Sequence, residues 1–332
     1  MAIIKLNQKA YKHNLCQIAS KAGGFKRLIC VFKNNAYGHG VKLLAPIAKE
    51  LGVCFIALKN EREALEFEDF FDHILILSHI PNGKENPKFI YALNDIKNLA
   101  LLKKGTRIHL AIDTGMHRNG VKLQDIKEAF DEAKKLGLRI EGIFTHFLGS
   151  DEMDASFFVQ RQKFNEAKKI ASSISETKLT FHACNSSALF RSQALEKDEL
   201  CRVGLAQFGY AQFSSNLKKV LSLYAHKLSS RVLQAGQSVG YGGKFCAKEA
   251  MKIATYDLGY ADGLFRFDGK GKLRLANGAF LLGKMSMDSF SCEDFGEELC
   301  VFDDANVWAE FFHTIDYEIL AKLSPFIPRV LV

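Results

Sequence analysis

A lysine that follows an apolar run is the first residue of the chain whose position suits chemistry. The run Arg27–Asn34 is predicted to be a strand, and Lys33 lies near its carboxyl end. In a parallel barrel that end faces the mouth where enzymes build their sites. Burial beside apolar side chains would lower the pKa of the Lys33 amine and make it a usable nucleophile or base. A surface lysine that merely ends a strand is the alternative. Tyr37 and the glycines at 38 and 40 favour a site, because they offer a hydroxyl and a close backbone approach.

The elements that would position this lysine alternate along the first two thirds of the chain. Short runs rich in Ile, Val, Leu and Phe are separated by amphipathic stretches such as Val121–Leu136. Strand-then-helix repetition at about 20 to 30 residues predicts right-handed βαβ units with parallel pairing. Eight such strands favour a closed (β/α)8 barrel over an open doubly wound sheet. The predicted barrel strands are Arg27–Asn34, Val53–Leu58, His73–His79, Phe89–Asn94, Arg107–Asp113, Arg139–Phe147, Lys178–Asn185 and Cys201–Gly209.

The pattern of the sequence changes after about Gln212. Helical periodicity largely disappears until Thr314–Leu323, and Gly-rich or Asp-rich turns separate short apolar segments. We therefore predict an α/β protein in which an N-terminal (β/α)8 barrel, residues 1–215, precedes a C-terminal mainly β domain, residues 216–332. The predicted strands of the second domain are Leu221–Leu233, Lys252–Leu258, Lys272–Leu282 and Glu298–Trp308.

The composition excludes several classes of protein. With 48% hydrophobic and 25% charged residues, the chain is an ordinary globular protein. The net charge of +8 comes from scattered basic residues, so we expect no nucleic-acid surface. The eight cysteines form no C-x-x-C pair and no zinc-like spacing, which favours reduced thiols, a cytoplasmic location and no metal site. We expect neither a signal peptide nor a membrane span, because no apolar run approaches the ~18 residues that a span requires.

The motif around Lys33 resembles the pyridoxal-phosphate lysine motif of bacterial alanine racemases. Further family motifs follow in the same order over almost the entire chain, and so many in one order are specific. Together with Ala36-Tyr37-Gly38-His39-Gly40 they are Asp113-Thr114-Gly115-Met116-His117-Arg118, Phe144-Thr145-His146-Phe147, His182-Ala183-Cys184-Asn185-Ser186-Ser187, Arg202-Val203-Gly204, Gly240-Tyr241-Gly242, Gly259-Tyr260-Ala261-Asp262-Gly263, Met287-Asp288 and Asp316-Tyr317-Glu318. The resemblance implies an enzyme that uses pyridoxal 5'-phosphate to interconvert L-alanine and D-alanine, supplying D-alanine for cell-wall peptidoglycan.

The resemblance also implies a two-base mechanism on a pyridoxal-phosphate aldimine. Lys33 forms a Schiff base with the cofactor, and its amine, once freed by the substrate, takes or returns the α-proton on one face. Tyr241 matches the family's second base, which the other subunit of a homodimer delivers; a strand-edge aromatic is the alternative. Because an unperturbed phenol has a pKa of about 10, it needs a helping environment near neutral pH. His146 is similar to the histidine in that tyrosine's network, with a purely structural hydrogen-bonding role as the alternative.

Arg202 resembles the arginine that meets the pyridine nitrogen of the cofactor. A guanidinium with a pKa above about 12 keeps its proton and leaves the ring nitrogen unprotonated, which makes the cofactor a weaker electron sink and transamination rarer. An arginine in a surface ion pair is the alternative. For the cofactor phosphate, the resemblance implies hydroxyl groups and backbone N–H groups at barrel loops seven and eight. The implied phosphate ligands are the hydroxyls of Tyr37, Ser186 and Tyr317 and the N–H groups of Gly204 and Leu205. For Ser186 a helix N-cap role is the compatible alternative.

The substrate carboxylate is expected to meet a planar donor. The resemblance assigns this role to Arg118, together with the backbone N–H of Met287 from the partner subunit. Asp288 resembles a residue that lines the family's entrance or active site.

One position departs from the family pattern. Seven residues before Arg118 the family usually carries a lysine that becomes carbamylated and anchors the arginine, and this chain has Ala111. Asp113 shares a strand face with Ala111, but its side chain is much shorter than a carbamylated lysine. We therefore predict a small anion, most simply chloride, beside Arg118, with Asn119 or a water molecule as the fallback.

Two other functions are consistent with these residues. The chain could be a racemase of broader or different specificity, such as serine, or a non-catalytic pyridoxal-phosphate-binding regulator. The second domain with Tyr241 argues against the regulator, since a protein that only binds the cofactor has no need of an opposing base.

Overall fold

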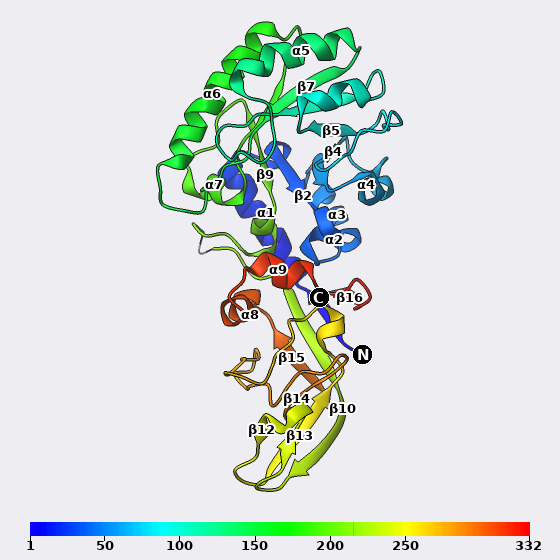
Figure 1. Ribbon diagram of the computed structural model, residues 1–332, viewed down its shortest axis with the longest axis vertical. Helices are drawn as coiled ribbons and strands as arrows, with labels where there is room; N and C mark the ends of the chain where they lie inside the picture. Colours follow the sequence, from blue (N-terminus) through cyan, green and yellow to red (C-terminus); the bar gives the residue numbers. More distant parts are fainter. Residues whose placement is uncertain (215) are drawn as a thin grey trace. The chain divides into compact units, whose positions relative to one another are not determined.

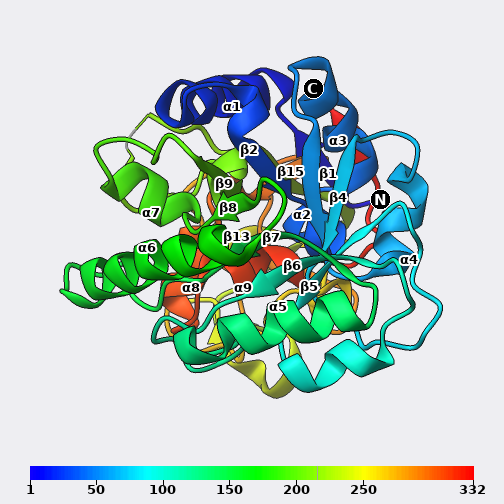
Figure 2. The same ribbon diagram turned by 90° about the horizontal axis from the view of Figure 1, so that it is seen from above.

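Eight parallel strands close into a barrel in the computed structural model, which describes residues 1–214 and 216–332 (Figures 1 and 2). Each strand pairs with the next, and the last pairs with the first through Leu28 and Cys201. Several strands are buried along their whole length, which explains their continuous apolar runs. The predicted barrel is therefore confirmed. Its strands are β2 (Leu28–Val31), β3 (Phe55–Leu58), β4 (His73–Ile76), β5 (Ile90–Leu93), β6 (Arg107–Ala111), β7 (Arg139–Phe144), β8 (Thr180–His182) and β9 (Glu199–Val203).

All barrel strands except β3 end earlier than predicted. β2 ends at Val31 rather than Asn34, and β9 ends at Val203 rather than Gly209. Arg202, expected at the start of its strand, is instead the penultimate residue of β9. Both Lys33 and Arg202 therefore lie at the carboxyl ends of neighbouring strands.

Helices cover the outside of the barrel. The predicted helix Val121–Leu136 is α5 (Ile126–Lys135), which begins later because residues 123–125 form a 3-10 turn. α5 contacts α6 (Ser156–Ile174), and the two lie side by side outside the barrel (Figure 2). The other helices along this part of the chain are α1 (Gln8–Ala22), α2 (Lys33–Tyr37), α3 (Val41–Glu50), α4 (Glu61–Ala64) and α7 (Ser186–Arg191), with 3-10 turns η1 (Phe25–Arg27), η2 (Leu65–Phe67), η3 (Ile96–Leu101), η4 (Leu123–Asp125) and η5 (Leu205–Phe208).

A six-stranded sheet forms the core of the other compact unit, which confirms a mainly β C-terminal domain. β10 (Leu221–Leu233) matches its predicted bounds and pairs with three other strands of this sheet (Figure 1). The remaining elements are β1 (Ile3–Leu6), β11 (Ser238–Val239), β12 (Phe245–Cys246), β13 (Met251–Tyr256), β14 (Phe290–Glu293), β15 (Glu298–Phe302), β16 (Arg329–Leu331), α8 (Ala305–Phe311), α9 (Asp316–Ala321) and the 3-10 turns η6 (Tyr241–Gly243) and η7 (Tyr260–Asp262). No helix among residues 1–214 and 216–332 is long and apolar enough to cross a membrane.

Two predicted strands of this unit are wrong in extent. Lys272–Leu282 makes only isolated bridges, because a turn with Gly278 at φ +88° folds the segment back on itself. Of Glu298–Trp308 only β15 is extended. The chain then enters α8, whose first turn is capped by Asp304, since that carboxylate accepts the Asn306 N–H.

The chain passes more than once between the two compact units, so no single boundary separates them. One unit comprises residues 1–11, 35–44 and 219–332, and the other comprises residues 12–34 and 45–218. The expected division between residues 215 and 216 lies near the last of these boundaries, although residue 215 itself is outside the described residues. It misses the amino end of the chain, where β1 pairs with both β10 and β16 and so belongs to the β unit.

Candidate active site

A left-handed turn follows the first barrel strand and carries Lys33. The backbone φ angle is +54° at Asn34, Asn35 and Ala36 and +53° at Tyr37. A non-glycine residue in this region costs roughly 1–2 kcal/mol relative to the right-handed helix. Such a run persists only where its surroundings over-determine it, and strain of this kind gathers at functional sites.

The Lys33 amine is tuned by its neighbours within the barrel unit. Burial lowers its pKa, and the cations Arg118 and Lys59 lower it further, while Glu63 raises it. Glu63 also fixes the backbone here, because its Oε1 accepts the Asn34 N–H and its Oε2 accepts the Lys59 N–H, each at 2.9 Å. At a given pH more of the Lys33 amine is therefore neutral than in an ordinary lysine, as a nucleophile or base requires.

Arg202 is buried and held by backbone carbonyl groups. Its Nη1 donates to the His182 oxygen at 2.5 Å and to His182 Nδ1 at 2.7 Å, and its Nη2 donates to the Thr145 oxygen at 2.6 Å. Burial lowers its pKa to about 10, so the guanidinium stays charged near neutral pH. No acceptor among residues 1–214 and 216–332 takes its Nε–H. One donor is thus left for an acceptor such as a ring nitrogen.

Two buried histidines continue from Arg202 into the barrel. Because the guanidinium can only donate, His182 Nδ1 accepts, and the ring proton lies on Nε2. That proton points to His109 Nδ1 at 2.7 Å. Burial keeps both rings neutral: the pKa of His182 is well below its usual value and that of His109 is about 3. Arg202 is therefore oriented by neutral groups.

His146 lies at the same end of the barrel, just beyond β7. Its Nδ1 is 3.4 Å from Arg202 Nη2. Burial lowers its pKa to about 3, and the charges of Arg202, Arg118 and Lys33 contribute. The imidazole is therefore neutral near pH 7 and can take part in hydrogen bonding without adding another cation.

The loop that carries Arg118 surrounds a small cavity. Arg118 itself is exposed. Asp113 is committed within the loop, since its Oδ1 accepts the N–H groups of Gly115 at 2.9 Å and His117 at 3.0 Å and its Oδ2 lies 3.0 Å from His117 Nδ1. The cavity measures about 50 Å³, and its lining includes Ala111 and Arg118. It has room for a water molecule or a small anion.

Ser186 lies beside the backbone at the end of β9. Its Oγ accepts the N–H groups of Gly204 at 3.1 Å and Ala206 at 3.4 Å. The N-cap role considered for Ser186 is wrong, because Asn185 is the N-cap of α7 and accepts the Ala188 N–H. The Gly204 N–H predicted for the phosphate is thus directed at the Ser186 hydroxyl, and Leu205 follows as the first residue of η5.

Tyr37 and Tyr317 lie together in the β-containing unit. Their ring centroids are 5.8 Å apart in an edge-to-face arrangement, and burial raises the pKa of Tyr37, so its phenol stays neutral. Gly38 explains the glycine of this motif. Its φ is +83°, and a Cβ there would lie 2.0 Å from the Leu320 carbonyl oxygen. Any side chain at position 38 would displace α9.

Tyr241, Met287 and Asp288 are exposed on the same unit. Tyr241 is 68% exposed and stands between Gly240 and Gly242, which have φ angles of +76° and +69°. Met287 is 54% exposed. This unit therefore presents a phenol and a large apolar side chain to its surface.

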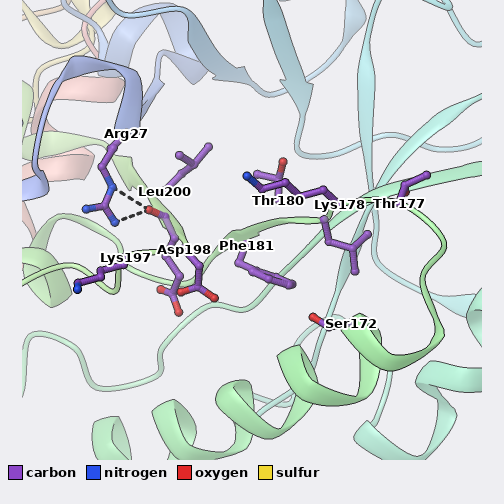
Figure 3. A pocket seen from close by; sticks show the side chains of 11 residues that line it. Arg27, Ser172, Thr177, Lys178, Thr180, Phe181, Lys197, Asp198 and Leu200 are labelled. Atoms are coloured by element: carbon purple, nitrogen blue, oxygen red, sulfur yellow. Dashed lines mark hydrogen bonds between the residues drawn. The ribbon is translucent and has the colours of Figure 1, made fainter.

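A groove of about 710 Å³ lies elsewhere on the barrel unit (Figure 3). It is lined by the amino-terminal ends of β8 and β9 and by Arg27, which donates from Nε and Nη2 to the Glu199 carbonyl oxygen at 3.2 and 2.8 Å. Lys33, Arg202 and His146 lie at the opposite, carboxyl ends of the barrel strands, where barrel enzymes build their sites. We assign no chemistry to this groove.

Comparison with known proteins gives the family. Residues 6–212 match the family model of the alanine racemase N-terminal domain, and residues 220–331 match that of the C-terminal domain. The chain belongs to the alanine racemase family. An alanine racemase of Campylobacter jejuni strain 81-176 is 62% identical over 332 residues, covering 100% of both chains, and one of Nitratiruptor is 41% identical over 343 residues, covering 99% of both.

Solved alanine racemases share the whole architecture. That of Streptomyces lavendulae has a TM-score of 0.88 at 25% identity, covering 100% of this chain and 97% of the other. That of Bacillus anthracis with bound L-Ala-P has a TM-score of 0.86 at 25% identity, covering 100% and 95%. The Bartonella henselae enzyme with covalently bound pyridoxal phosphate has the same fold, with a TM-score of 0.82 at 23% identity over 100% and 99% of the two chains.

Sequence reasoning missed several polar residues that lie near Lys33 and Arg202. Glu63, His109 and His182 were assigned no role, although His182 lies in a quoted motif. Glu63 had a local signal, because Asn60 caps α4 by accepting its N–H, as an Asn-x-x-Glu pattern predicts. His109 had none, since only the closed barrel brings it next to His182.

Proposed function

We propose that this chain is a pyridoxal 5'-phosphate-dependent alanine racemase, which interconverts L-alanine and D-alanine. One observation carries the proposal: an amine with a lowered pKa and a buried guanidinium with a spare donor lie at the carboxyl ends of neighbouring barrel strands. Its support from outside is the 62% identity to a C. jejuni alanine racemase over the full length of both chains.

The residues at the barrel mouth fit this cofactor. Lys33 would attach it, and the Arg202 Nε–H would meet the ring nitrogen. When bound, the cofactor withdraws electrons from the substrate Cα. Its phosphate would be held, as the resemblance implies, by the residues named for that role: Tyr37, Ser186, Gly204, Leu205 and Tyr317.

The remaining residues bind the substrate or transfer its α-proton. Lys33 takes or returns the α-proton on one face of the substrate, and Tyr241 does so on the other. Arg118 binds the carboxylate, helped by the Met287 N–H, with Asp288 near the entrance. Arg202 keeps its proton, because even a pKa of about 10 leaves it charged near pH 7.

We further propose a homodimer in which each site is completed by the other chain. The exposure of Tyr241 and Met287 supports it, since an acid/base group at 68% exposure lacks the sheltered environment that its chemistry needs. We place the enzyme in the cytoplasm, where D-alanine for peptidoglycan is made. In support, the structure describes all eight cysteines and pairs none in a disulfide.

The deciding experiment is racemisation of L-alanine in deuterated water, with and without added pyridoxal phosphate. We expect a visible cofactor absorption band and deuterium at Cα in both enantiomers. A protein without that band after reconstitution contradicts the cofactor. A bound cofactor with no racemisation of any amino acid indicates the regulator, and a larger kcat/KM for L-serine than for L-alanine indicates the other racemase.

An anion should occupy the cavity between Ala111 and Arg118. Asp113 is already bonded within its own loop, so it does not offset the Arg118 charge. We expect activity to rise with chloride and not with bicarbonate, and a crystal structure to show anion-sized density there. Dependence on carbon dioxide would show that a lysine elsewhere is carbamylated. A crystal structure in which protein atoms fill the cavity would contradict the anion prediction.

A further inference from the structure

Helix α6 buries one polar side chain among apolar ones. Its buried residues are Phe157, Gln160, Phe164, Ala167 and Ala171. Gln160 is only 2% exposed. A buried amide must find hydrogen-bond partners, so the position of this side chain is set by what it contacts.

The Gln160 amide joins two active-site segments. Its Nε2 donates to Thr114 Oγ1 at 3.1 Å and to the His146 carbonyl oxygen at 3.3 Å. Its Oε1 accepts the Leu148 N–H at 2.7 Å. Thr114 belongs to the loop that carries Arg118, and His146 is the second residue after β7. One side chain from outside the barrel therefore ties both to α6.

The direction of these hydrogen bonds is determined by counting protons. Thr145 Oγ1 donates its only hydrogen to the Ile112 carbonyl oxygen at 2.8 Å. Thr145 Oγ1 must therefore accept from Thr114 Oγ1, which lies 2.8 Å away. Thr114 has then used its hydrogen and accepts from Gln160 Nε2. The side chain at position 160 must therefore donate a hydrogen bond to Thr114 Oγ1 if all of these groups are to be paired.

We propose that Gln160 is a positioning residue for substrate binding, which holds the Arg118 loop against the His146 segment. The proposal rests on the proposed racemase function. Inside the barrel, the methyl group of Ala111 cannot hydrogen-bond to Arg118, so the hydrogen bonds from α6 are a support of this loop that side chains supply. The loop also lies beside α6: a Cβ added at Gly115, whose φ is +140°, would be at ordinary contact distance, 3.5 Å, from Gln160 Cγ.

The first test replaces the amide by an apolar side chain of similar size. In Gln160→Leu we expect the KM for L-alanine to rise about 10-fold or more, because a displaced Arg118 weakens carboxylate binding. Affinity for pyridoxal phosphate should stay within about 2-fold, since Lys33 and Arg202 make none of the Gln160 bonds. The matched control is Gln162→Leu, the same change at an exposed position of α6, which should leave KM unchanged.

A second measurement needs neither cofactor nor substrate. In the cofactor-free protein, hydrogen exchange of the Leu148 amide should be at least about 10-fold faster in Gln160→Leu than in the native chain, because its acceptor is gone. Peptides covering residues 112–119 should also exchange faster. Peptides covering β2 and β3 serve as the internal control and should be unaffected.

A charged variant tests the donor requirement. In Gln160→Glu the carboxylate still accepts the Leu148 N–H, but when ionised it cannot donate to Thr114. Its protonated form can donate, and burial raises the pKa of a carboxyl group. We therefore expect the KM defect to be largest at high pH and to shrink as the pH falls, relative to the native enzyme at each pH.

The outcomes separate this proposal from the proposed function. If the native enzyme racemises alanine while Gln160→Leu keeps its KM and its Leu148 exchange rate, Gln160 has no positioning role. If exchange is faster but KM is unchanged, the role is structural only, and the proposal is overturned. If the native, folded chain does not racemise alanine at all, the proposed function is wrong.

Discussion

Lys33→Ala and Tyr241→Phe proteins should each racemise alanine about 10³-fold more slowly than the native enzyme, yet regain activity when mixed. Lys33 lies in the barrel unit and Tyr241 in the β unit, and each variant removes one of the two proposed bases. If each site takes Lys33 from one chain and Tyr241 from the other, a hybrid dimer contains one intact site and one doubly defective site.

The amount of recovered activity is itself predicted. Random exchange of equal amounts makes half of the dimers hybrids, so about a quarter of all sites should be intact. The measurement is racemase activity after mild denaturation and refolding of the mixture, with hybrid formation checked by native mass spectrometry. Lys163→Ala, which removes an exposed lysine, is the control and should remain active alone. Confirmed hybrids without activity would contradict a shared site.

The barrel was predictable because its signal is local. Strands such as β2, β3 and β5 are buried on both faces, so selection for apolar side chains left continuous runs in the sequence. The positions of Lys33 and Arg202 followed, since strand ends in a parallel barrel collect at one mouth. The hydrogen-bond partners of Arg202 could not be predicted in the same way, because they come from segments far apart in the chain.

Other features had no local signal. The left-handed turn from Asn34 to Tyr37 contradicts the intrinsic preference of Ala36 and Tyr37, which adopt it where tertiary contacts impose it. β1 is four residues long, and only its pairing with β10 and β16 assigns it to the β unit.

Gln160 illustrates a signal that was present but not used. It lies at the apolar spacing of α6, between Phe157 and Phe164, so helical periodicity alone places an amide in the core. A polar residue at a core position requires partners, and those partners define part of a site. The identity of the partners, Thr114 and the His146 carbonyl group, required the structure.

Arg202→Glu should convert part of the racemase activity into transamination. The new carboxyl group would be buried and would face the carbonyl oxygens of His182 and Thr145, which now accept from the guanidinium. Both conditions raise the pKa of a carboxyl group, so it can give a proton to the ring nitrogen of the cofactor. A protonated ring would be a stronger electron sink. The α-proton could then be delivered to a carbon of the cofactor instead of the substrate Cα, as transamination requires.

We expect racemisation to fall about 10²- to 10³-fold, the usual effect of removing a preorganised charge at a reacting centre, while pyruvate forms from L-alanine. The amino group of one alanine would pass to each bound cofactor and water would supply the carbonyl oxygen of pyruvate, so without an added amino acceptor at most one pyruvate per bound cofactor is expected. Arg202→Lys keeps a cation and is the control: it should lose activity without gaining pyruvate. Because both variants leave carbonyl groups unpaired, folding is checked first by the thermal unfolding midpoint. If the folded glutamate and lysine variants formed equal amounts of pyruvate, the side chain at position 202 would not determine whether the substrate Cα or the cofactor is protonated.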